Sequence, residues 1–236
     1  MRTLRYALLG AVWLLALAAA ASDDPGRIDA YVTPYYDSSG PVVNVGKYSS
    51  GLASTNPAAF VATIRRMKQD WNALTFVELY VGAIRLYDLG YRNEATYWFY
   101  SAQYKGRQFG LMLDQKKIGG MGSPAFELYH AQDAFFELAG PKINGFAYGN
   151  VDALVSILHR VQSGNRDVEN LRGAYPGVAF VPPSEWAGIN AGLNKSMGEF
   201  AASVTKQKSQ IEKERAANGT AAKFSSLRSR PFPGGL

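Results

Sequence analysis

The chain has 236 residues, of which 47% are hydrophobic, and a formal net charge of +6. Its length suits one domain with extensions, and its composition is that of a globular protein with a real core. It contains no cysteine, which excludes disulfides, a cysteine nucleophile and the lipid-bearing residue of a lipoprotein.

Positive charge is concentrated at the C-terminus. Residues 206–236 hold seven lysines and arginines against two glutamates, whereas residues 22–205 are close to neutral. A nucleic-acid-binding domain carries a basic stripe on its folded body. We therefore expect no nucleic-acid partner.

Residues 1–21 have the order of a secretory signal peptide. Arg2 and Arg5 precede an apolar run, and small residues before the Ser-Asp-Asp segment supply a cleavage site after Ala20 or Ala21. The run is short for a bilayer span, so we expect no membrane span after cleavage. The sequence therefore predicts a periplasmic or secreted bacterial protein, with an uncleaved anchor as the alternative.

Residues 22–55 are predicted to form an extended arm with a β-hairpin. Two segments rich in β-forming residues, 28–36 and 42–48, flank the Asp-Ser-Ser-Gly-Pro sequence at 37–41, which has the composition of a turn. Pro34 limits the first strand to an edge or a break. The arm would lie over the helices or offer an edge for pairing.

Residues 56–205 are predicted to form an α-helical domain, so we expect a mainly α fold. Asn56 is a good helix cap and Pro57 suits the first helical position. Phe60, Ile64 and Met67 follow at the spacing of one buried helical face.

A helical hairpin is predicted at residues 73–109. Apolar and aromatic residues recur there at three- and four-residue steps, Gly90 suits the turn, and Asn93 is the expected cap of the second helix. Residues 97–100 are all aromatic and point in every direction around that helix. The helix therefore lies at the centre of the fold or in an interface, and the candidate partner-binding residues are Tyr97, Trp98, Tyr100 and Tyr104. We predict that Trp98 packs in the core on the same stripe as Ala95 and Ala102, whose small side chains leave room for a facing helix. An exposed Trp98 that recognises a partner is the alternative.

This hairpin resembles a Sel1-type repeat, a relative of the tetratricopeptide repeats. The resemblance is carried by Leu86-Tyr87, Gly90, Glu94-Ala95, Trp98-Phe99, Ala102 and Gly106. It implies a helical bundle or a short helical array that binds another protein. We therefore expect an exported, non-enzymatic interaction module. Its partner would be another protein in the periplasm or at the cell surface, including a secreted toxin that it neutralises as an immunity protein.

The second half of the domain is predicted to contain three more helices. The first begins at Pro124, ends at Gly140-Pro141 and buries Phe126, Tyr129 or His130, Ala134 and Leu138. The second, 151–162, is capped by Asn150. The third begins at Ser184, with Gly188 and Gly192 on a close-packed face. Residues 206–236 are predicted to be a polar helical extension followed, from residue 220, by a disordered basic tail.

Catalytic chemistry has weak support in the sequence, and we expect no cofactor, no metal and no catalytic residue. Glu127 and His130 share a helix face, and with His159 they leave a single-metal site open as an alternative. Glu78 or Glu127 would serve a second alternative, a helical hydrolase of the cell envelope. A structural accessory of an envelope or secretion complex is the third.

Overall fold

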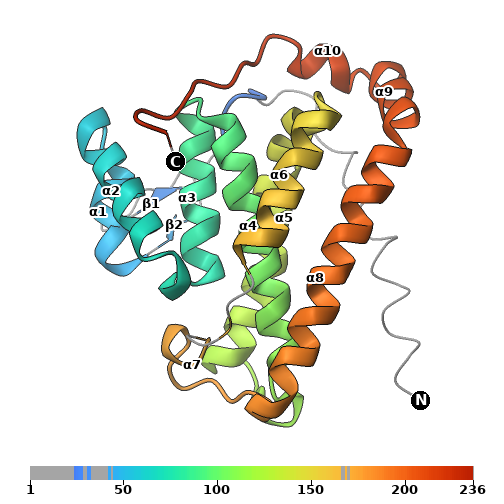
Figure 1. The fold of residues 1–236 in the computed structure, drawn as a ribbon. Coiled ribbons are helices and arrows are strands. Elements are labelled where there is room, and N and C mark those ends of the chain that lie inside the picture. The colour runs from blue at the N-terminus through green and yellow to red at the C-terminus, as the bar shows by residue number, and fades with distance from the viewer. Residues whose placement is uncertain are drawn as a thin grey trace.

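The computed structural model describes residues 24–28, 31–32, 42–43, 45–165, 168 and 171–235, and this part is mainly helical (Figure 1). The predicted signal peptide, residues 1–21, lies outside the described residues. The helices of the described part are α1 Ser49–Ala53, α2 Pro57–Gln69, α3 Phe76–Asp88, α4 Arg92–Met112, α5 Pro124–Ala147, α6 Val151–Gly164, α7 Leu171–Ala174, α8 Pro183–Lys206, α9 Lys208–Ala217 and α10 Thr220–Phe224. No described helix is both long enough and apolar enough to cross a membrane.

The β-hairpin predicted in the 22–55 arm is not supported by the described residues of that segment. Two short strands, β1 (Tyr31–Val32) and β2 (Val42–Val43), pair in parallel, whereas the strands of a hairpin are antiparallel. A 3₁₀ helix, η2, occupies Gly46–Tyr48, where a strand was expected, and α1 follows it. Val45, Tyr48 and Leu52 are buried, and their spacing of three and four residues is helical.

The helix predicted from Asn56 is confirmed as α2. The Asn56 side chain accepts hydrogen bonds from the backbone N–H groups of Ala58 and Ala59 at 2.9 and 3.3 Å. Phe60, Ile64 and Met67 are all buried. The cap and the apolar spacing together were sufficient to predict this element.

The predicted helical hairpin is confirmed as α3 and α4. Gly90 has φ +83°, and the N–H of Tyr91 donates to the carbonyl of Leu86 at 2.8 Å, which is the Schellman arrangement for ending a helix. The predicted cap by Asn93 is wrong, because α4 begins at Arg92. The N–H of Asn93 donates instead to Oγ of Ser229 at 2.9 Å, so the C-terminal tail caps this helix.

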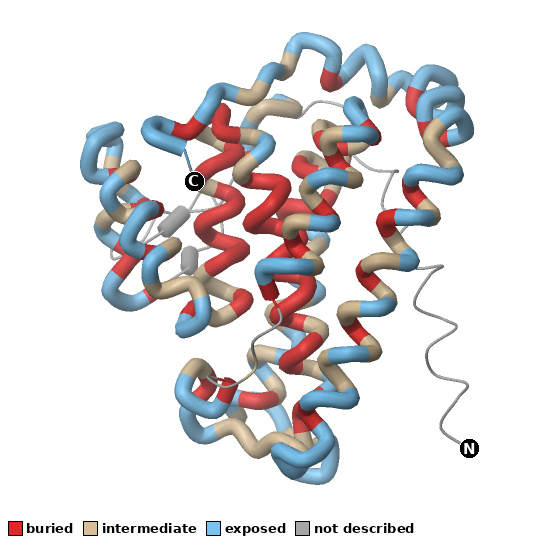
Figure 2. The backbone as a smooth tube through the Cα atoms, in the orientation of Figure 1, coloured by how far each residue is buried: buried red, intermediate tan, exposed pale blue. Residues whose placement is uncertain are grey.

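α4 lies at the centre of the fold, with α3, α5, α6 and α8 all packed against it (Figure 1). Figure 2 shows the buried residues concentrated along α3 and α4. Trp98 fits against Gly82 of α3, where a Cβ atom would lie 2.6 Å from the indole ring. The absence of a side chain at Gly82 therefore lets the two helices approach, a role that the sequence pattern assigned to Ala95 and Ala102.

α5 differs from its prediction in both length and buried face. It continues through Pro141 to Ala147, and the residues that it buries include Phe135, Ala139 and Ile143 rather than the predicted Phe126, Tyr129, His130, Ala134 and Leu138. Gly140 does not have the positive φ of a helix-ending glycine. Burial of the last turns against α4 outweighs the one backbone hydrogen bond that a proline cannot make.

α8 begins at Pro183 and packs against α6 and α4. Trp186, Leu193 and Met197 are buried. The close-packed face predicted at Gly188 and Gly192 is wrong, because nothing lies within 4 Å of a Cβ atom at either position.

The C-terminal segment is ordered, contrary to the predicted disorder from residue 220. After α9 the chain forms α10 and then crosses the molecule to the α3–α4 turn (Figure 1). Phe224 and Phe232 are buried, and the N–H of Arg230 donates to the carbonyl of Gly90 at 2.8 Å. The ring of Phe232 lies 5.2 Å from that of Tyr91. These few aromatic anchors and backbone bonds offset the cost of ordering a polar segment.

Candidate functional site

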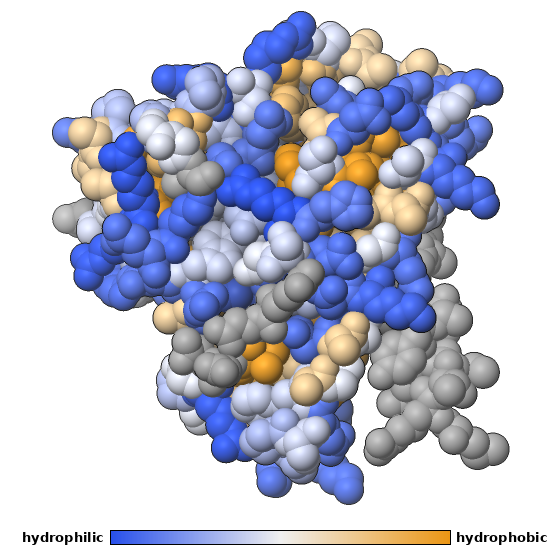
Figure 3. Space-filling model, viewed as in Figure 1, coloured by the Kyte–Doolittle hydropathy of each residue, from blue (hydrophilic) through white to orange (hydrophobic). Residues whose placement is uncertain are grey.

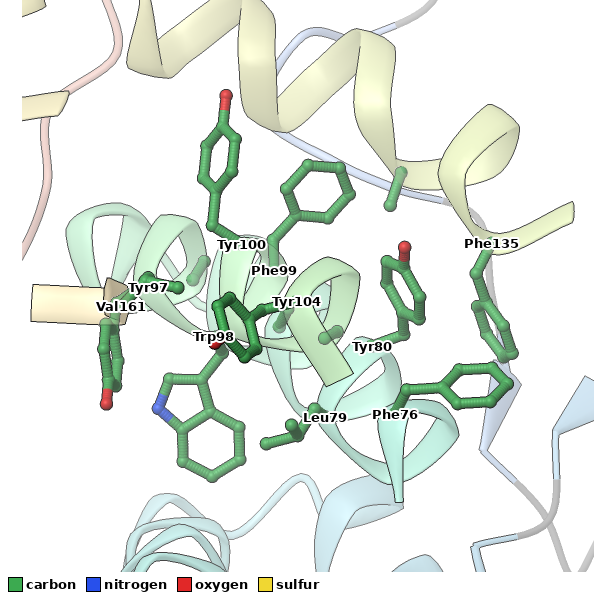
Figure 4. Packing of buried hydrophobic residues seen from close by; sticks show 14 of the residues in the cluster. Phe76, Leu79, Tyr80, Tyr97, Trp98, Phe99, Tyr100, Tyr104, Phe135 and Val161 are labelled. Atoms are coloured by element: carbon green, nitrogen blue, oxygen red, sulfur yellow. The ribbon is translucent and has the colours of Figure 1, made fainter. Parts of the chain in front are cut away.

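The four predicted partner-binding residues do not form a surface. Tyr97, Trp98, Tyr100 and Tyr104 are all buried, and Figure 4 shows Tyr97, Trp98 and Tyr100 leaving α4 in different directions. Each of these side chains is buried because other helices pack against α4 on several sides. The prediction that Trp98 belongs to the core is therefore confirmed.

The residues considered for metal binding do not come together, and the two candidate catalytic glutamates accept hydrogen bonds from backbone N–H groups. Glu78 belongs to the capping box of α3, where Oε2 accepts a hydrogen bond from the N–H of Thr75 at 2.7 Å. Glu127 accepts one from the N–H of Gly122 at 2.8 Å. No group of three or more metal-binding side chains comes together within the described ranges, so the single-metal site of Glu127, His130 and His159 is wrong.

A cavity of about 560 Å³ lies between the body of the protein and its C-terminal segment. Its walls come from the start of α4, the end of α5, the first turns of α6, and α9, α10 and the tail. Figure 3 shows hydrophobic side chains gathered beneath α10 and between α6 and α9, with hydrophilic ones around them. The lining side chains used below are Phe146, Leu154, Ile157, Glu212, Arg215, Phe224, Leu227, Arg228 and Ser229.

Gly145 of α5 lets the C-terminal segment pack closely over this cavity. A Cβ atom at Gly145 would lie 2.2 Å from the ring of Phe224, so the ring of α10 occupies the space that a side chain would fill. Gly219 joins α9 to α10 with φ +78°, a conformation that favours glycine. The chain can therefore turn sharply and lay α10 against α5.

Arg215 of α9 is the notable charged group in the cavity wall. Only 4% of its surface is exposed, and its guanidinium reaches the α5–α6 connection, where Nη2 would lie 3.4 Å from a Cβ atom at Gly149. Nη1 is buried and has no hydrogen-bond partner in the part of the chain that the structure describes. A buried guanidinium N–H group without an acceptor is costly, because it has lost its hydrogen bonds to water.

The electrostatic surroundings of Arg215 do not compensate its charge. Burial lowers the pKa of Arg215, and no carboxylate among the described residues raises it. Arginine nevertheless stays charged in proteins. Arg228 adds a second positive charge to the lining, and Glu212 adds a negative one. The cavity therefore favours an anion, with one buried guanidinium available to bind it.

The hydroxyl groups in the cavity wall are not arranged as nucleophiles. The hydroxyls of Thr96, Ser225 and Ser229 donate to the backbone carbonyls of Arg92, Ala222 and Arg230. A nucleophilic hydroxyl instead gives its proton to a base. This arrangement suits binding rather than covalent catalysis.

Sequence reasoning missed this site because Arg215 lies in a run of lysine and glutamate that looks solvated. One signal was present. Arg215 follows Ile211 by four residues, and both are buried on the same side of α9. An arginine on the apolar side of an otherwise polar helix was the observable sign of a buried charge.

Comparison with known proteins adds one distant similarity. The chain is 22% identical over 146 residues to an uncharacterized protein of Haemophilus influenzae, a match that spans 60% of this chain and 54% of that protein. The chain thus spans about half the length of this relative. It matches no protein-family profile and no solved structure.

Proposed function

We propose that this chain is a non-enzymatic, α-helical binding protein that takes a small organic anion into the cavity beneath its C-terminal segment. The observation that carries the proposal is Arg215, a buried residue of the cavity lining whose Nη1 has no hydrogen-bond partner among the described residues. The fork of a guanidinium matches the two oxygens of a carboxylate or phosphate. A bound anion would supply the acceptor that the described residues do not.

The volume and composition of the cavity also support binding. About 560 Å³ falls within the usual range for small-molecule sites. Such sites combine mainly apolar walls with a few polar groups that orient the ligand. Here Phe146, Leu154 and Ile157 form part of the apolar wall, and Arg215 is the orienting group.

Arg215→Met tests the proposal, since methionine keeps a long side chain and removes the charge. In a buffer free of phosphate and carboxylate, the variant should be as stable as the wild type or more stable, because an uncompensated buried charge is removed. Added inorganic phosphate or acetate should raise the melting temperature of the wild type, as any ligand of the folded state does, and should not raise that of Arg215→Met.

Arg66→Met is the matched control for this experiment, because Arg66 is exposed on α2. It should retain the response of the wild type to added anions. An equal response in Arg215→Met and the wild type would refute the proposed site. A large loss of stability in Arg215→Met without added anion would show that the guanidinium has a structural role instead.

Protein binding, as expected from the Sel1-type resemblance, is the second candidate function. Three large hydrophobic side chains, Leu111, Met121 and Tyr129, are exposed around the α4–α5 connection, and Met121 is 91% exposed. Under this proposal an envelope protein, such as a toxin encoded beside this gene, covers them. A variant with Met121→Ser and Tyr129→Ser should then lose co-purification with the product of the adjacent gene. Retained co-purification would exclude this surface.

Export is part of both proposals. The order of residues 1–21 supports cleavage of a signal peptide after Ala20 or Ala21 and release into the periplasm or the medium. The N-terminal mass of the exported protein tests this directly. An intact Met1 on the exported chain would refute cleavage.

A further inference from the structure

We propose that the anion bound beneath the C-terminal segment is a single-chain amphiphile, namely a fatty carboxylate with its head group on Arg215 and its alkyl chain along the apolar wall. This inference rests on the proposed binding function and names the class of ligand. It follows from the distribution of charge and apolar surface within one cavity.

The charge of the cavity selects a carboxylate over a more highly charged head group. Arg215 is a single buried guanidinium, and the cavity lining also includes Glu212 from the preceding turn of α9. The other lining arginine, Arg228, already donates to the carbonyls of Ser225 and Leu227 at 2.6 and 2.9 Å. Two arginines and one glutamate leave the lining with a net charge of +1, which matches one negative charge, and the glutamate disfavours a second.

A small inorganic anion bound at Arg215 would leave the apolar part of the cavity wall without a contact. Leu154 and Ile157 are three residues apart on α6 and therefore share a face. Phe146 from α5, and Phe224 and Leu227 from the C-terminal segment, complete this wall. Hydrophobic side chains are visible on this face of the molecule in Figure 3. An alkyl chain attached to the bound carboxylate would cover this surface.

The cavity is formed by both the body of the protein and a segment that ends the chain. α10 and the tail are held over it by Phe224 against Gly145 and by Ser229, whose Oγ accepts from the N–H of Asn93 at 2.9 Å. A ligand that contacts Arg215 and the apolar wall therefore touches α6, α9 and α10 together. Binding should stabilise the docked position of this segment.

A chain-length series of carboxylates tests the inference by titration calorimetry below the micellar concentration. Acetate, hexanoate, octanoate, decanoate and dodecanoate differ only in apolar surface. Each buried methylene should tighten binding by about fourfold, until the wall is covered. Dodecanol and dodecyl phosphate are the head-group controls, and both should bind more weakly than dodecanoate.

Two variants separate the head-group site from the apolar wall. Arg215→Met should lose most of the preference for dodecanoate over dodecanol. Ile157→Ser, which changes a half-buried residue of the wall, should reduce the gain per methylene and leave acetate binding unchanged. Ile189→Ser is the matched control, because Ile189 is likewise of intermediate burial, lies on α8 and is not part of the cavity lining.

The outcomes distinguish the two proposals from each other. If acetate or phosphate binds through Arg215 and longer chains bind no better, the amphiphile is refuted and the anion site stands. If dodecyl phosphate binds more tightly than dodecanoate, the carboxylate head group is refuted. If Arg215→Met keeps the preference of the wild type for dodecanoate over dodecanol, or if no anion binds, both proposals are refuted.

Discussion

Replacing Trp98 with alanine tests the packing of α4 against α3. The Trp98 side chain is wholly buried, and its ring lies 5.2 Å from that of Trp71 in an edge-on contact. Loss of a buried tryptophan typically costs about 3–5 kcal/mol, out of about 5–15 kcal/mol that keeps a domain folded. The indole Nε1 has no hydrogen-bond partner among the described residues, so loss of a hydrogen bond adds nothing to this cost.

The expected change in thermal stability follows from these values. A chain of this size loses about 2–4 °C of melting temperature per kcal/mol, so the melting temperature of Trp98→Ala should fall by about 6–20 °C. The measurement is a thermal melt followed by circular dichroism. An unchanged melting temperature would refute the packing argument and would return Trp98 to the partner-binding hypothesis.

Gly82→Ala provides a second test of the same contact. In the wild type the new methyl group would lie 2.6 Å from the Trp98 ring, and such overpacking costs about 1–3 kcal/mol. In the Trp98→Ala background the methyl group enters vacated space, and alanine favours a helix over glycine by about 0.5–1 kcal/mol. Gly82→Ala should therefore destabilise the wild type and be neutral or stabilising in the double variant.

Urea denaturation of the four proteins gives the coupling energy between the two positions. Direct contact predicts a coupling energy well above the error of the measurement. Equal costs of Gly82→Ala in both backgrounds would show that the two residues do not touch.

Three further predictions concern other parts of the fold. Removing residues 220–236 takes away two buried aromatic side chains and should cost at least about 3 kcal/mol; calorimetry that shows an unchanged melting temperature would mean that the tail contributes nothing. Gly90→Ala should cost about 1 kcal/mol by urea denaturation, because φ there is +83°, whereas Gly173→Ala, at an open helical position, should be neutral or stabilising. A hydrogen bond from the Tyr48 hydroxyl lowers the pKa of Asp70 in the folded protein. The Asp70 carboxylate therefore stabilises the fold fully above its ordinary, unfolded-state pKa of about 4. This stabilisation is lost as the pH falls through the lower pKa of the folded state. The stabilities of Asp70→Asn and the wild type should therefore differ at neutral pH and converge in acid, and parallel loss at every pH would refute this.

Local sequence rules predicted the elements whose ends and faces depend on neighbouring residues. Asn56 and Pro57 mark the start of α2, and Gly90 marks the end of α3, because caps act within one helical turn. The aromatic residues at 97–100 indicated a central helix or an interface, since one helix cannot turn four consecutive side chains toward a single neighbour. The mainly α class followed from the same periodicities.

The packing of the helices determined the length of α5 and the order of the C-terminal tail, which local sequence rules did not predict. Pro141 follows a glycine and carries the ordinary signals of a helix end, yet α5 continues because its last turns are buried against α4. The tail has the composition of a disordered segment, yet Phe224 packs against α5 and Phe232 packs at the α3–α4 turn. Both outcomes depend on surfaces supplied by residues far away in the chain.

The candidate site depends most strongly on tertiary structure. Arg215 in sequence is one basic residue among many, and its charge becomes significant only because α9 brings it against the α5–α6 connection, where it is buried. The sequence by itself determined the helices and their caps, because those depend on interactions within a few residues. Burial of a charge depends on which distant segments cover it, and only the packed chain decides that.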